Sequence, residues 1–252
     1  MKDLNAATLQ DFKDFYKTYY SPNNSVLTVA GDINIGRTKS LIEKYYGDIP
    51  PQDIPELKKI DEPIQQGHRS VTLKKDVQST TFMLGFQGPS VNDEDLPAME
   101  ILSYILGNGD SSRLHQKLVY NQQLANETWA FAYSLAIRGA FLVNVAVKPG
   151  QNVDSAINSV YAEIYKTRTE KVSEEELTKA RNMLISELVG RLKTAHGKAY
   201  ALAGTEVVAG DYNRLFSDIA RYAKVTPEDV LNVAKKYLTP NQRSIVRVVP
   251  KS

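Results

Sequence analysis

The sequence contains no cysteine among its 252 residues, and this absence excludes three kinds of chemistry. There can be no disulfide framework, no thiolate nucleophile and no cysteine-ligated zinc. The chain also lacks a large charge of one sign, because 31 basic residues balance 29 acidic residues to a formal net charge of +2. A nucleic-acid-binding protein needs a basic excess to offset phosphate charge, so the composition argues against nucleic acid as a partner.

Long apolar runs are also absent. No run approaches the roughly 20 residues that a membrane-spanning helix needs, so no membrane span is predicted. The segment from Met1 to Tyr16 mixes charged and apolar residues and is not a signal peptide, so any export signal would lie upstream of it. What the chain has is an ordinary globular composition, with 42% apolar and 24% charged residues over a length that can bury a substantial core.

A segment near the start of the chain recurs 218 positions later. The shared residues are Thr8, Asp11, Lys17, Tyr19, Pro22 and Asn23 in one copy and Thr226, Asp229, Lys235, Tyr237, Pro240 and Asn241 in the other. Each copy predicts a helix capped by its threonine, a Pro-Asn turn and an apolar strand, at 26–30 and at 245–249. We interpret the match as a duplication, and expect the chain to begin inside a first repeat whose earlier part precedes Met1.

Prolines concentrate between the two copies, with four of them inside a stretch of 14 residues. They are Pro50, Pro51, Pro55 and Pro63. Because proline lacks an amide donor and disfavours helix, we expect an inter-domain linker here. The predicted organisation is the C-terminal part of a first domain over 1–49, a linker over 50–66 and a complete second domain over 67–252.

Hydrophobic periodicity within the second domain predicts strands first and helices afterwards. The strands are expected around 71–73 and 82–86, with a hairpin formed by 131–135 and 141–147 across a turn at 137–139. The helices are expected at 92–106, from near Ser111, and at 153–165, 173–189, 198–208, 215–222 and 226–238. This order indicates an α+β fold in which helices pack on a layered sheet.

Candidate catalytic and metal-binding groups are scarce. The three histidines, His68, His115 and His196, have no second histidine or carboxylate at metal-ligand spacing. Neither H-E-x-x-H nor H-x-x-E-H occurs in the chain. We therefore predict no catalytic residue and no metal ligand within it.

Two further segments have alternative interpretations. Residues 107–113, Gly-Asn-Gly-Asp-Ser-Ser-Arg, resemble a phosphate-binding loop, but they follow a predicted helix and no Gly-Lys-Ser/Thr comes after them. A turn between helices, capped by Asp110 or Ser111, is the simpler interpretation, and an unrelated nucleotide- or anion-binding domain is the remote alternative. Residues 174–176, three glutamates, open a helix where acids complement its dipole, so we expect a solvated helix start rather than a metal site.

Three segments together resemble the insulinase-type zinc metallopeptidases, which include pitrilysin and the mitochondrial processing peptidases. The first is 15–32, which contains Tyr-Tyr-Ser-Pro-Asn, the second is 106–114, which contains Ser-Ser-Arg-Leu, and the third is 174–182. The ending at 237–241 also resembles the family. The resemblance covers essentially the whole chain. It implies a protein built from pairs of similar α+β domains, in agreement with the duplication.

The resemblance also implies where the zinc of the intact protein would be. In that family an H-x-x-E-H motif and a distant glutamate of the first domain hold the metal, and the glutamate inside the motif is the general base. By the resemblance this site would lie upstream of Met1, and the equivalent helix of the second domain, near 98–102, has no histidine. Zinc is therefore expected in the intact protein and not in this chain.

A second family signature is an arginine and a tyrosine, seven residues apart, that help bind substrate. By the resemblance these positions are occupied by Val119 and Asn126. Valine has no donor and asparagine is shorter than tyrosine, so we expect this domain not to supply the pair.

The leading prediction is that the chain is the C-terminal, substrate-chamber portion of a zinc endopeptidase that acts on peptides or unfolded proteins. Its partner would be the missing N-terminal region of the same protein. The alternative is an inert partner or core subunit that assembles with a second peptidase-like subunit or as a homodimer. Under either prediction the chain alone is inactive, and the resemblance favours the bacterial periplasm over the cytoplasm.

Overall fold

The computed structural model of the chain describes residues 2–56 and 62–251. It divides into two compact units, one made of Met1–Lys59 with Arg191–Tyr212 and the other of Ile60–Gly190 with Asn213–Ser252. Residues 191–212, which we expected within the second domain, thus group with the first segment. The boundaries at 49 and 66 remain a prediction.

The described residues of the second unit form one five-stranded sheet. Its strands are β1 (Arg69–Lys75), β2 (Thr81–Gly88), β3 (Ala125–Tyr133), β4 (Gly139–Val147) and β5 (Arg243–Pro250), in the spatial order β1-β5-β2-β4-β3. The predicted hairpin is confirmed as β3 and β4, which pair antiparallel with a register shift between Ala125 and Glu127. β5 lies between β1, to which it is parallel, and β2, to which it is antiparallel.

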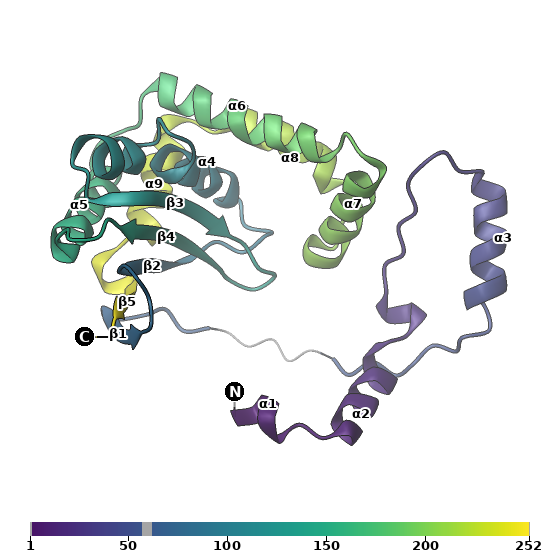
Figure 1. The fold of residues 1–252 in the computed structure, drawn as a ribbon. Coiled ribbons are helices and arrows are strands. Elements are labelled where there is room, and N and C mark those ends of the chain that lie inside the picture. The colour runs from purple at the N-terminus through teal and green to yellow at the C-terminus, as the bar shows by residue number, and fades with distance from the viewer. Residues whose placement is uncertain (1, 57–61, 252) are drawn as a thin grey trace. The chain divides into compact units, whose positions relative to one another are not determined.

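Helices cover one face of this sheet and create the hydrophobic core (Figure 1). The helical elements are α4 (Leu96–Gly107), the π-helix η2 (His115–Asn121), α5 (Val153–Lys166), α6 (Glu174–Arg191), α8 (Arg214–Lys224), α9 (Pro227–Tyr237) and the 3-10 turn η3 (Pro240–Gln242). Alternate side chains of β2 and β4, among them Phe82, Leu84 and Phe141, are buried against α4 and α9. The α+β layered fold predicted from the sequence is therefore confirmed.

The first unit consists of helices that bury few side chains. It contains α1 (Lys2–Ala6), α2 (Leu9–Tyr19), the 3-10 turn η1 (Pro22–Asn24), α3 (Ile35–Tyr46) and α7 (Ala195–Ala209). The strand expected at 26–30 is wrong, because these residues have no regular secondary structure. A strand needs a neighbouring strand for its backbone hydrogen bonds, and the described residues of this unit provide none.

The duplication found in the sequence is visible in the element boundaries. α2 and α9 begin and end 218 positions apart, and so do the turns η1 and η3. Each helix opens with the predicted capping box, in which the backbone N–H of Thr8 or Thr226 donates to the aspartate three residues on, at 2.7 and 2.8 Å. The helix and turn of the repeat are thus confirmed.

Other differences from the predicted elements have local causes. α4 begins at Leu96 rather than Asn92, because Asp93 Oδ1 accepts the backbone N–H of Asp95 at 3.0 Å and forms a turn before the helix. The helix expected from near Ser111 is a π-helix, which hydrophobic periodicity does not distinguish from an α-helix. The strand expected around 71–73 is confirmed as β1, and all of its residues are exposed.

Candidate functional site

The loop that resembles a phosphate-binding loop is a turn between α4 and η2, as the simpler interpretation predicts. The expected cap by Asp110 or Ser111 is wrong, because the N-cap residue of η2 is Leu114, which makes no side-chain cap hydrogen bond. Its first glycine has a packing role, since a Cβ on Gly107 would lie 2.1 Å from the backbone nitrogen of Ala130 in β3. Gly109 has a φ of +79°, a left-handed conformation that glycine adopts without strain. The two glycines therefore allow α4 to approach the sheet and the chain to turn.

The π-helix that follows borders two hollows. π-helices are rare and often occur at functional sites, so this helix marks the candidate site. The charged hollow, of about 480 Å³, is lined by Arg113, Gln116, Lys117, Asn121, Gln122, Glu163, Lys166 and Glu176. The Val119 hollow, of about 520 Å³, is lined by Val119, Tyr120, Gln123, Ala125, Asn126 and Lys148.

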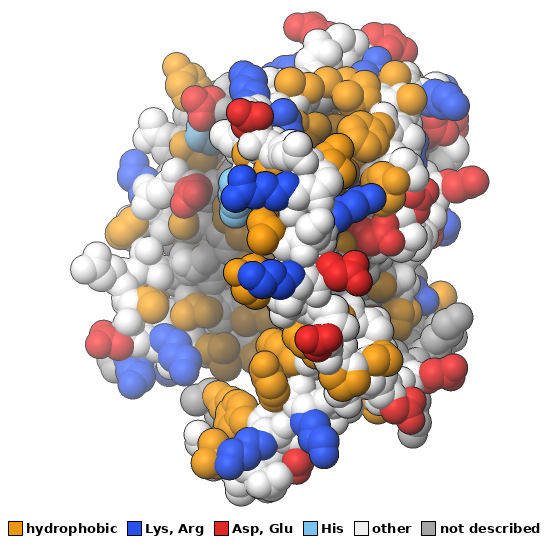
Figure 2. Space-filling model, turned by 90° about the vertical axis from the view of Figure 1, so that its right-hand side faces the viewer, with side chains coloured by type: hydrophobic (Ala, Val, Ile, Leu, Met, Phe, Trp, Pro, Cys, Tyr) orange, Lys and Arg blue, Asp and Glu red, His pale blue; other side chains and the backbone are white. Residues whose placement is uncertain are grey.

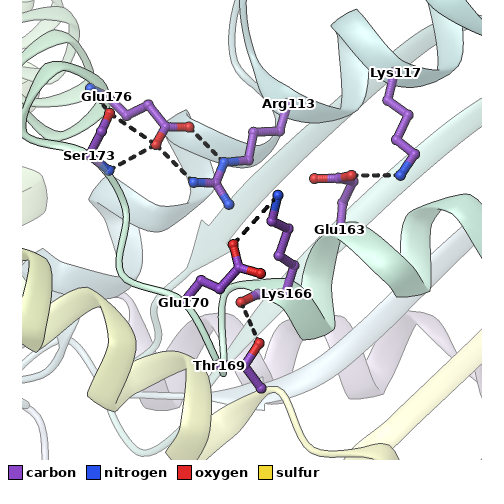
Figure 3. Close-up of polar contacts among 8 residues, drawn as sticks. All are labelled: Arg113, Lys117, Glu163, Lys166, Thr169, Glu170, Ser173 and Glu176. Atoms are coloured by element: carbon purple, nitrogen blue, oxygen red, sulfur yellow. Dashed lines mark hydrogen bonds and ion pairs between the residues drawn. The ribbon is translucent and has the colours of Figure 1, made fainter.

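Ion pairs organise the charged hollow (Figure 3). Arg113 donates from Nε and Nη2 to the two carboxylate oxygens of Glu176, at 2.6 and 2.8 Å. Lys117 Nζ lies 2.7 Å from Glu163 Oε1, and Lys166 Nζ lies 3.5 Å from Glu170 Oε2. These contacts join the start of η2 to the end of α5 and to the start of α6, so opposite charges are balanced around the hollow.

Arg113 and Glu176 shift each other's pKa values. The hydrogen bonds from Arg113 are the main cause that lowers the pKa of Glu176 to about 2, and the backbone N–H of Ser173 adds to it. The same hydrogen bond raises the pKa of Arg113. Glu176 also forms a capping box with Ser173, whose Oγ accepts the backbone N–H of Glu176 at 3.1 Å. Both side chains are therefore charged at neutral pH.

The Val119 hollow brings together the two positions at which the family resemblance implies the arginine and tyrosine. Val119 is partly buried against the core, and Asn126 is exposed at the register shift of β3. Gln123, between them, has a φ of 52°, which holds the connection in a left-handed turn. Among the described residues that line this hollow, Lys148 is the one with a charged side chain.

The histidines lie apart from both hollows or lack a metal-binding environment. His68 Nδ1 accepts a hydrogen bond from Arg243 Nε at 3.1 Å, and His196 packs beside Tyr200 within α7. His115 Nε2 lies 3.9 Å from Asp110 Oδ1. Across residues 2–56 and 62–251, no three histidine or carboxylate side chains come together in a way that could hold a metal ion.

The three glutamates at the start of α6 have separate environments. Glu176 faces Arg113, whereas Glu174 and Glu175 border a hollow of about 990 Å³ between α4 and α6. Tyr104 donates a hydrogen bond to Glu187 across that hollow. The glutamates thus open the helix, as expected from their sequence position.

The charges on the surface are intermixed, as the balanced composition suggests. Basic and acidic side chains intermix over the face drawn in Figure 2, with apolar side chains exposed between them. None of the helices in the described part of the chain is long and apolar enough to cross a membrane.

Comparison with known proteins shows which family has this sequence and fold. A family model described as the peptidase M16 inactive domain matches residues 6–184. A curated relative, the zinc protease PqqE of Helicobacter pylori, is 28% identical over 99% of this chain and 57% of its own length.

Solved structures agree with that match. A protease from Helicobacter pylori superposes with a TM-score of 0.92 at 26% identity, over 99% of this chain and 61% of the other. A peptidase M16 inactive domain from Pseudomonas fluorescens has the same fold, with a TM-score of 0.83 at 19% identity over 98% of this chain and 58% of the other. The chain thus spans less than two thirds of the length of these relatives.

Proposed function

Because the chain belongs to the peptidase M16 inactive-domain family, we propose that it is the non-catalytic part of a zinc endopeptidase. In this role it forms part of the wall of a chamber that holds peptides or unfolded proteins. The observation that carries the proposal is the match to an inactive domain over residues 6–184 in a chain whose described residues form no metal-binding cluster. The zinc and its general base would belong to a second region or polypeptide.

The unequal burial of the two repeats supports such a second region. In α9, Val230, Val233 and Ala234 are at most 2% exposed, whereas their counterparts in α2, Phe12, Phe15 and Tyr16, are 57–63% exposed. Apolar side chains gain roughly 25 cal/mol for each Å² removed from water, so the exposed face of α2 favours association with an apolar surface. A domain of the same architecture as the second unit would provide that surface.

An inert partner subunit is the second candidate. The Val119 hollow favours it, because neither Val119 nor Asn126 offers the donors of arginine and tyrosine that the family resemblance implies for substrate binding. The two candidates differ in where the zinc motif is encoded. An H-x-x-E-H motif in the same polypeptide supports the first, and its presence only in a separate polypeptide supports the second.

Activity and metal content test the proposal together. We expect the purified chain to contain far less than one zinc per molecule and to leave a quenched fluorescent peptide intact, with or without added zinc. Hydrolysis should appear when the chain is combined with the polypeptide that carries the zinc motif. The measurements are elemental mass spectrometry and fluorescence release with and without a chelator.

The control is the same mixture in which the glutamate inside the zinc motif is replaced by glutamine, which should abolish hydrolysis. One zinc per molecule in the chain alone, with hydrolysis that a chelator removes, would show that the chain is itself the peptidase.

A further inference from the structure

Three arginines gather where α5 lies over β5. Arg243 and Arg247 are four positions apart, each two positions from the buried Ile245, so all three side chains lie on the same side of β5. The guanidinium carbon of Arg243 lies 4.1 Å from the ring centre of Tyr161, and its Nη1 donates to Tyr165 Oη at 2.8 Å. Arg168 lies over the same Tyr165 ring at 5.7 Å. We call Arg168, Arg243 and Arg247 the arginine strip.

The arginine strip has more positive charge than its surroundings neutralise. Its one carboxylate contact within the described chain is Asp154 Oδ1, 3.4 Å from Arg247 Nη1, and that aspartate side chain is 73% exposed. The Nε atoms of Arg168 and Arg247 are buried and have no hydrogen-bond partner among the described residues. Partly desolvated guanidinium groups with unmet donors favour a carboxylate, because charge-assisted hydrogen bonds are strong in such surroundings.

The edge strand β1 extends this basic surface. In the register of the sheet Thr72 lies opposite Arg247, so Ser70, Thr72 and Lys74 share the face of the arginine strip. Within the described part of the sheet, β1 pairs only with β5, and its other edge is free. Val71 and Leu73, on the opposite face, are 51% and 41% exposed.

The charges of β1 select between possible occupants of this edge. Arg69, Lys74 and Lys75 would face like charges if a second copy of β1 paired here, and lysines on edge strands are known to prevent such pairing. A strand that carries acidic residues would meet opposite charges instead. The balanced net charge of +2 argues against a nucleic acid as the polyanion.

We propose that the free edge of β1 binds an extended acidic peptide segment of another protein, which adds a sixth strand to this sheet. Because strand side chains alternate, carboxylates would lie on the side of Lys74 and the arginine strip, and apolar side chains would cover Val71 and Leu73. A strand added beside β1 would lie about 10 Å from β5, within the combined reach of arginine and glutamate side chains. This site is independent of the proposed role in peptidolysis.

The binding of a designed peptide tests the proposal. A labelled peptide of alternating glutamate and valine, seven residues long, should bind the intact chain in fluorescence anisotropy, and the binding should weaken as salt is added. Peptides with glutamine or lysine in place of glutamate should bind at least about tenfold more weakly. Equal binding of the glutamine or lysine peptide would overturn the proposal.

Single substitutions locate the site. Arg247→Gln and Lys74→Gln should each weaken the glutamate peptide, Arg247→Gln by about tenfold and Lys74→Gln by less, since Lys74 is more exposed. Lys235→Gln removes the same charge from an exposed position of α9 and should leave binding unchanged. An equal loss in all three variants would mean that only general charge attraction operates, and would refute the site.

Backbone methylation tests the strand pairing separately. The N–H groups of successive residues point to opposite edges of a strand, so the donors that face β1 belong either to all the glutamates or to all the valines. One peptide is therefore N-methylated at every glutamate and a second at every valine, and only one of the two loses these donors. One of the two methylated peptides should lose most of its binding while the other retains it. If both bind as the parent peptide does, the segment does not add to the sheet.

Discussion

The contact between Arg113 and Glu176 joins residues 63 positions apart through two parallel hydrogen bonds. It fixes the start of the π-helix to the first turn of α6, and both side chains are largely shielded, at 17% and 32% exposure. Because the guanidinium stabilises the charged carboxylate, folding is linked to the deprotonation of Glu176. This linkage has a measurable dependence on pH.

Replacement of Glu176 by glutamine should lower the free energy of unfolding by about 2 kcal/mol at pH 7, since Arg113 would lose a charged partner. The pKa of Glu176 is lowered from 4.5 to about 2, so its contribution is complete above about pH 4.5 and is lost as the pH falls toward 2. The difference between wild type and Glu176→Gln should therefore shrink over that range. Urea unfolding at a series of pH values measures it.

Glu175→Gln is the matched control for this prediction, because Glu175 is exposed in the same turn of α6. It should change the free energy of unfolding by no more than about 0.5 kcal/mol. A difference for Glu176→Gln that stays constant from pH 6 to pH 2 would contradict the linkage.

The second prediction at this scale concerns Gly107. Gly107→Ala should destabilise the second unit by about 1–3 kcal/mol, because the new methyl group would overlap the backbone of Ala130 and push α4 away from β3. Gly204→Ala, in α7 with no atom near the new methyl group, should instead be neutral or stabilising by about 0.5–1 kcal/mol. Thermal unfolding of both variants gives the comparison, and an unchanged melting temperature for Gly107→Ala would contradict the packing role.

At the scale of elements, α2 and α9 show that one sequence pattern can have two environments. Their capping boxes, lengths and following turns agree, so local sequence determines where each helix begins and ends. Their burial does not agree, because α9 packs on α4 and β2 while α2 buries no residue. The stability of a helix in a protein comes mainly from such packing.

Hydrogen exchange should therefore separate the two helices. We expect the amides of α2 to exchange orders of magnitude faster than those of α9, because opening α2 exposes little apolar surface. Mass spectrometry of peptides from 9–19 and 227–237 measures this directly. Addition of the polypeptide that covers α2 should slow its exchange and leave α9 unchanged. Equal protection of the two helices in the chain alone would contradict the prediction.

Most elements of the second unit could be predicted because their signals are local. The strands β2 and β4 and the helix α6 were predicted from patterns of neighbouring residues, and all three elements are confirmed. The exposure of β1 and the coil at 26–30 could not be predicted, because they depend on which other strands are present. The π-helical hydrogen bonding of η2 also has no signature in its pattern of apolar residues.

At the scale of the whole molecule, the family could be recognised from three segments, and the match to the peptidase M16 inactive domain confirms that recognition. The charged hollow could not be predicted, because Arg113, Glu163 and Glu176 come from separate parts of the sequence. No sequence motif indicates which residues they contact. Val119 and Asn126 were singled out by resemblance, and the structure brings them to one hollow. Their effect on substrate binding remains a prediction.

The position of β5 within the sheet also determines the order in which a nascent chain can assemble. Within the second unit β1 and β2 are the first strands to be synthesised, but both pair with a strand that begins 168 residues after β1 ends, at Arg243. A ribosome must therefore complete almost the whole second unit before β1 gains its backbone partner. Until then β1 is an unpaired strand in a growing polypeptide, and such strands invite misassembly and binding by chaperones. The basic residues of β1 would then already have a role during synthesis, because their repulsion would keep the β1 strands of neighbouring nascent chains from pairing with one another.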